Sequence, residues 1–265
     1  MRWLALLLVP ALVAAAPPKL KAGEEARIKF AIDRGEELFE IDRAAWVTTD
    51  DMVEKRGDDR SAGLIKGWVV EREAGAPHAY IVTYYTNDPG GRRALYVGHV
   101  RDNKVVSAAL VPAEKPVALT QTQARLADAV EAARERSKFK PCTPANFNVT
   151  AVPPKVPSGP VEVYLLTAMV RSGEYPFGGH YRLEVGDKGR IRSSRKFTNA
   201  CMNIPDGRGA DGEQSVALGV THLLDPVPTE IHVFMSIWLG KPIYVSAGNR
   251  VWEVAGPAIR LVSKI

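Results

Sequence analysis

Between residues 64 and 111, runs of strand-forming residues recur at short spacing with turn sequences between them. The four runs occupy residues 64–71, 79–86, 93–101 and 104–111. The sequence NDPGG fills residues 87–91, and Asp102 and Asn103 separate the last two runs. Such residues are typical of tight connections between neighbouring strands. The pattern therefore predicts an antiparallel meander.

Helices are expected on both sides of this meander. Residues 24–34 begin with two glutamates and carry apolar residues at helical spacing, and Gly35 is expected to end that helix. Residues 36–49 fit neither period cleanly, and extended structure is expected in their second half. Residues 120–137 have a threonine suited to capping and a regular apolar stripe. The N-terminal half is predicted to be helix–meander–helix.

The C-terminal half is rich in strand-forming segments. The candidates are residues 161–170, 180–185, 190–197, 215–220, 230–239, 242–246, 250–254 and 259–262. A proline-rich linker over residues 139–160 separates the two halves. We therefore predict an α+β fold with antiparallel sheets. Residues 17–140 and 141–265 are expected to form either two units or one continuous domain.

The first 16 residues have the build of a secretory signal peptide. Arg2 precedes an apolar run, and alanines at residues 14–16 follow it, with cleavage expected after Ala15. No cysteine follows the run, so we expect no lipid anchor. No later stretch approaches the ~18 apolar residues that a membrane-spanning helix needs. The sequence predicts a soluble protein that is periplasmic or secreted.

The two cysteines, Cys142 and Cys201, are expected to form a single structural disulfide. An even number of cysteines in an exported chain favours pairing, and with two cysteines there is one connectivity. The C-x-x-C spacing of redox-active pairs is absent.

The charge distribution argues against nucleic-acid binding. The 35 lysines and arginines exceed the 30 acidic residues, for a formal net charge of +5, and both signs are interspersed. A nucleic-acid interface needs a basic face with aromatic partners. Residues 207–212 spell G-x-G-x-x-G, but this segment precedes a strand-like run instead of opening a helix, so we interpret it as a surface loop.

The densest group of potential metal ligands lies in residues 221–245. Residues 230–239 alternate as a strand would, which places Glu230 and His232 on the face opposite an apolar row. A turn after His222 and Asp225 would bring these four side chains together. Imidazoles and carboxylates are suitable ligands for zinc or another divalent ion. A solvated sheet face remains the more ordinary interpretation of the same pattern.

A second candidate site is the segment YPFGGHY at residues 175–181. Paired glycines beside Tyr175, Phe177, His180 and Tyr181 would allow a ligand to approach the backbone closely. The alternative is a glycine turn that enters a strand, with aromatic side chains covering the edge. If His180 lay near His222 and His232, it would add a third imidazole to the metal site.

Two function classes follow from these candidates. The first is a non-enzymatic envelope protein that binds a partner protein or a small ligand. The second is a metal-dependent hydrolase that uses His222, Asp225, Glu230 and His232, with a carboxylate as general base. The sequence leaves the cofactor unknown, and it holds no G-x-S-x-G motif of a serine hydrolase.

Overall fold

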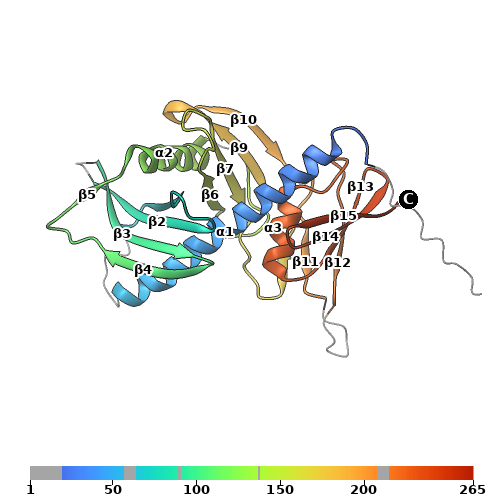
Figure 1. The fold of residues 1–265 in the computed structure, drawn as a ribbon, viewed down its shortest axis with the longest axis horizontal. Helices are drawn as coiled ribbons and strands as arrows, with labels where there is room; N and C mark the ends of the chain where they lie inside the picture. The colour runs from blue at the N-terminus through green and yellow to red at the C-terminus, as the bar shows by residue number, and fades with distance from the viewer. Residues whose placement is uncertain (1–19, 57–63, 89–90, 137, 208–214, 265) are drawn as a thin grey trace, which may run out of the picture.

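The molecule is elongated, and its longest element is helix α1 (Glu24–Arg56). The computed structural model describes residues 20–56, 64–88, 91–136, 138–207 and 215–264. Figure 1 shows α1 running along the molecule, with one sheet against each of its ends and another beside its middle. The predicted signal peptide lies outside the described residues, as does most of the glycine-rich segment at residues 207–212.

The helix is longer than the sequence pattern predicts. The expected end at Gly35 is wrong, and so is the extended structure expected within residues 36–49, because α1 continues through both. Gly35 is buried where α1 packs against α3 (Glu230–Leu239). It is a position of close helix contact and not a stop signal.

The predicted meander is confirmed. Strands β1 (Gly67–Arg72), β2 (Ala79–Asp88), β3 (Gly91–Arg101) and β4 (Lys104–Leu110) pair antiparallel in chain order, and β5 (Val117–Ala118) pairs with β3. Asp102 and Asn103 form the turn before β4 with φ of 48° and 61°, a left-handed conformation that their short polar side chains tolerate. The second half of α1 packs on this sheet, where the hydroxyls of Thr49 and Tyr84 lie 2.7 Å apart.

The predicted second helix is α2 (Gln121–Arg136), which packs between the meander and the middle sheet. The Gln123 N–H donates to Thr120 Oγ1 at 3.1 Å, and the Thr120 N–H donates to Gln123 Oε1 at 3.0 Å, so the two side chains cap the helix reciprocally. The middle sheet has the order β10-β9-β7-β6. Its strands are β6 (Asn148–Val152), β7 (Val161–Leu166), β9 (Tyr181–Val185) and β10 (Ile191–Lys196), with a 3₁₀ turn η2 (Asp187–Gly189) before β10. Strand β6 falls within the predicted linker.

The remaining six strands lie between residues 174 and 264. They are β8 (Glu174–Pro176), β11 (Asn203–Pro205), β12 (Leu218–Thr221), β13 (Ile243–Ala247), β14 (Arg250–Ala255) and β15 (Ala258–Lys264). Strand β11 pairs with β8, while β12 to β15 form a sheet in chain order. All of these pairs are antiparallel except β12 with β13, which is parallel because α3 connects them.

The strand expected at residues 230–239 is wrong, since this segment forms helix α3. Seven of its ten residues are apolar. Alternation cannot distinguish a buried strand from a buried helix in so short a run. The decisive signals are at its ends. Thr229 is the N-cap in extended geometry, and Gly240 ends the helix with φ of 64°.

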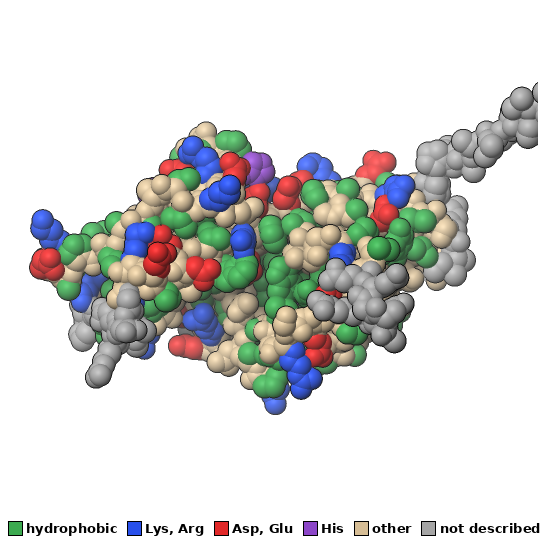
Figure 2. Space-filling model, turned by 90° about the horizontal axis from the view of Figure 1, so that it is seen from below, with side chains coloured by type: hydrophobic (Ala, Val, Ile, Leu, Met, Phe, Trp, Pro, Cys, Tyr) green, Lys and Arg blue, Asp and Glu red, His purple; other side chains and the backbone are tan. Residues whose placement is uncertain are grey.

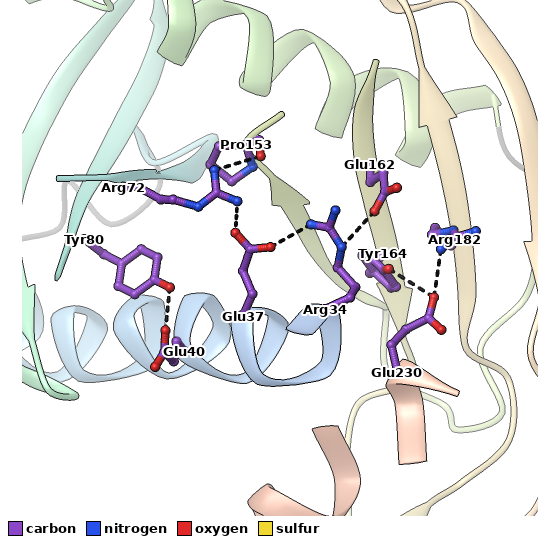
Figure 3. A network of polar contacts seen from close by, with 10 residues as sticks. All are labelled: Arg34, Glu37, Glu40, Arg72, Tyr80, Pro153, Glu162, Tyr164, Arg182 and Glu230. Carbon is purple, nitrogen blue, oxygen red and sulfur yellow. Dashed lines mark hydrogen bonds and ion pairs between the residues drawn. The ribbon is translucent and has the colours of Figure 1, made fainter. Parts of the chain in front are cut away.

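Long-range polar contacts and one disulfide join these layers. The predicted disulfide between Cys142 and Cys201 is present. The helices and antiparallel sheets confirm the predicted α+β fold. Figure 3 shows Arg34 of α1 between two carboxylates, at 2.8 Å from Glu37 and 3.1 Å from Glu162. Glu37 also pairs with Arg72 of β1. These contacts fix α1 against the meander and the middle sheet together.

Candidate functional site

Three of the four predicted metal ligands, His222, Asp225 and His232, lie close together at the N-terminal end of α3. The rings of His222 and His232 lie 4.8 Å apart, nearly perpendicular to each other. His222 Nε2 lies 2.8 Å from Asp225 Oδ2, and Arg195 donates to the same oxygen at 2.8 Å. Burial opposes ionisation of Asp225, but the contacts with His222 and Arg195 outweigh it and lower its pKa. The structure therefore places these imidazoles in a cluster that already includes an arginine.

Glu230 has different partners. Its Oε1 accepts hydrogen bonds from Arg182 at 2.9 Å and from the Tyr164 hydroxyl at 3.2 Å (Figure 3). This is a consequence of α3, because a helix directs Glu230 and His232 to different neighbours where a strand would align them. In the described residues, no group of three or more His, Cys, Asp or Glu side chains is arranged to hold a metal ion.

The His232 side chain caps the N-terminus of α3. The Thr229 N–H donates to His232 Nδ1 at 3.0 Å, which leaves the proton of the neutral imidazole on Nε2. Burial, and after it the nearby His222, lower the pKa of His232 to about 3. The imidazole is therefore neutral at ordinary pH.

The aromatic segment 175–181 divides among different environments. Phe177 is buried, and Tyr175 packs edge-on against Trp238 with ring centroids 5.6 Å apart. Tyr181 stacks on Phe139 at 4.0 Å. His180 is the member of this segment that lines the cavity described next.

The paired glycines of this segment accommodate the disulfide. A Cβ atom on Gly179 would lie 2.5 Å from Cys142 Sγ, and one on Gly178 would lie 2.5 Å from the Ala200 carbonyl oxygen. Gly179 also has φ of 74°, which favours glycine. Glycine is thus required at both positions, because Cys142 and Ala200 of the same chain pack too closely for a larger side chain.

The structure also contains a cavity of about 420 Å³ with largely apolar walls, which we call the tryptophan cavity. It lies between the second half of α1, the start of β1, the end of β7 and α3. Its lining residues are Asp42, Ala45, Trp46, Thr49, Trp68, Asn148, Leu166, Thr167, Ala168, Met169, His180, Phe234 and Trp238. Figure 2 draws one face of the molecule, and hydrophobic side chains gather near its middle. A volume of this order suits a small organic ligand.

Three of the chain's five tryptophans line this cavity. Trp46 comes from α1, Trp68 from β1 and Trp238 from α3, so their sequence positions are far apart. Trp46 is 57 % exposed, which is unusual for so large an apolar side chain that only packs a core. No local sequence motif joins these residues, so the sequence pattern did not point to this site.

A carboxylate also lines this cavity. Its residue, Asp42, is half-buried. Burial raises its pKa from the ordinary value of 3.8 to about 6. A carboxyl group perturbed by burial in an aromatic cavity is typical of a binding or catalytic site.

Comparison of the chain with protein-family models, with curated proteins and with solved structures finds no match. Among the described residues, no helix is long and apolar enough to cross a membrane.

Proposed function

We propose that this protein is an exported, non-enzymatic binding protein whose site for a small ligand is the tryptophan cavity. The observation that carries the proposal is the convergence of Trp46, Trp68 and Trp238 on one open cavity that also contains a carboxylate. Tryptophan offers a large apolar surface with little conformational freedom to lose on binding, which makes it effective in ligand recognition. The disulfide is compatible with a location outside the cytoplasm.

The proposal is tested by screening a library of neutral, cationic and anionic fragments by ligand-observed NMR with the purified protein. We expect hits whose binding is lost in Trp46→Ala, since Trp46 is largely exposed and its removal leaves the core intact. Tyr244→Ala is the matched control, because it removes an exposed aromatic residue of β13 outside the cavity. The absence of any hit that responds to Trp46→Ala would refute the proposed site.

A metal-dependent hydrolase is the second candidate, and the contact between His222 and Asp225 beside His232 favours it. The pairing of Glu230 with Arg182 counts against it, because that carboxylate is already neutralised. The zinc content of the purified protein and its melting temperature with and without a chelator distinguish the two. Stoichiometric zinc, with a melting temperature that falls on chelation and recovers on addition of metal, would favour the hydrolase.

A further inference from the structure

The charge of the tryptophan cavity rests on Asp42. Among its lining side chains, all of them in the described part of the chain, Asp42 and His180 are the ionisable ones. The Thr167 N–H donates to His180 Nδ1 at 3.2 Å, so Nε2 carries the proton and donates to the Pro176 carbonyl oxygen at 2.7 Å. Both nitrogens of a neutral imidazole are thereby satisfied. The carboxylate of Asp42 is the remaining charge.

This carboxylate has no cationic partner within the described residues. The adjacent Arg43 places its guanidinium over the Trp46 ring, 4.2 Å from the ring centroid, and forms no ion pair with Asp42. An unpaired carboxylate beside apolar walls is unfavourable because it loses hydration without gaining a counter-charge. A positively charged ligand would supply that counter-charge.

The walls of the cavity favour the same kind of ligand. Trp46, Trp68 and Trp238 all line it. Tryptophan attracts cations through its electron-rich π system more strongly than the other aromatic residues do. Aromatic rings around a cation are the usual means by which proteins recognise quaternary ammonium groups.

The distribution of hydrogen bonds argues against a sugar. The Thr49 hydroxyl donates to the Ala45 carbonyl oxygen at 2.7 Å, and the Thr167 hydroxyl donates to the Gly179 carbonyl oxygen at 2.8 Å. With His180 also engaged, few polar side chains of the cavity are left to satisfy the many hydroxyl groups of a carbohydrate.

We propose that the tryptophan cavity binds an organic cation, an ammonium group carried on a small apolar body, with Asp42 as its counter-charge. This inference rests on the proposed binding function and specifies the ligand class of the same site.

The test compares three probes of nearly the same shape: phenyltrimethylammonium, its neutral isostere tert-butylbenzene, and the anion 4-tert-butylbenzoate. Binding to the purified protein is followed by tryptophan fluorescence at pH 7.5. We expect the cation to bind at least about tenfold more tightly than the neutral isostere, and the anion not to bind. Asp42→Asn is expected to reduce cation affinity by about tenfold and to leave tert-butylbenzene within about twofold.

Asp50→Asn is the matched control, because Asp50 is an exposed carboxylate on the same helix and lies outside the cavity. Equal affinity of the cation and the neutral isostere, or an equal loss in both aspartate variants, would overturn the cation assignment. Binding of tert-butylbenzene that depends on Trp46 while phenyltrimethylammonium fails to bind would refute this inference and leave the proposed site standing. Failure of all three probes would refute it as well, and the fragment screen then judges the site itself.

Discussion

A Cβ atom added to Gly35 would lie 2.5 Å from Cβ of Val233 and 2.6 Å from the carbonyl oxygen of Glu230. Helices α1 and α3 therefore approach each other at a distance that only glycine permits. This contact holds α3, and with it Phe234 and Trp238, against the helix that carries Asp42 and Trp46.

Replacement of Gly35 by alanine should destabilise the protein. Alanine ordinarily favours a helix interior by about 1 kcal/mol over glycine. Here the added methyl group overlaps α3, and overpacking of this kind costs about 1–3 kcal/mol or more. Urea unfolding measures the effect. Val233→Gly in the same chain removes the Cβ atom that the added methyl group meets and should recover part of the loss. Additive effects of the two substitutions would contradict a direct contact.

Loss of the disulfide should lower stability strongly. The bond joins cysteines 59 positions apart, for which the chain-entropy relation gives about 4 kcal/mol. We expect Cys142→Ser/Cys201→Ser to lower the midpoint of urea unfolding, and added reductant to have no further effect on that variant. If complete reduction of the wild-type protein, checked by thiol titration, left its unfolding midpoint unchanged, the predicted contribution would be wrong.

The buried histidines should make the protein acid-sensitive. Burial lowers the pKa of His180 to about 4 and that of His232 to about 3. Between pH 6.5 and these values the unfolded chain binds protons that the folded chain does not, so the free energy of unfolding falls as pH falls. Each such histidine contributes about 1.4 kcal/mol per pH unit over that window.

The check is urea unfolding from pH 7 to pH 4 for the wild type and for His180→Gln, in which the amide retains a donor and an acceptor. We expect a shallower pH dependence in this variant. Identical slopes in the two proteins would contradict the assignment to His180.

Asp42→Asn should stabilise the free protein at neutral pH. The folded-state pKa of Asp42, about 6, lies above the ordinary value of 3.8, so stability is lost as pH rises through this interval and the loss is complete above pH 6. After allowance for the partial exposure of the side chain, we expect a gain of about 1–2 kcal/mol at pH 7.5. The gain should vanish near pH 4. A destabilised variant at pH 7.5 would show that the carboxylate supports the fold.

The meander was predictable because its information is local. Turn residues such as Asp102 and Asn103 specify how adjacent strands connect, and the neighbouring runs then have one obvious pairing. Helix α2 was predictable for a similar reason, since Thr120 and Gln123 mark its start.

The remaining elements depend on contacts between distant segments. The alternation of Ile231, Val233 and Met235 matches a strand, yet these residues are buried in a helix with neighbours on all sides. Gly35 has the residue type of a helix end, and its role depends on Val233, which lies almost 200 residues later. The candidate site shares this property, because Trp46, Trp68 and Trp238 meet only after the chain has folded.

The pairing of Glu24 with Arg250 has a consequence for the order in which the molecule assembles. The Arg250 Nη1 donates to Glu24 Oε2 at 3.0 Å, and 226 positions of chain separate the two residues. During synthesis, the first helix leaves the ribosome long before β14 exists. The N-terminal turn of this helix therefore reaches its final environment only after almost the entire chain has been synthesised. Contacts of such long sequence separation slow folding, because a large loop must close before they form.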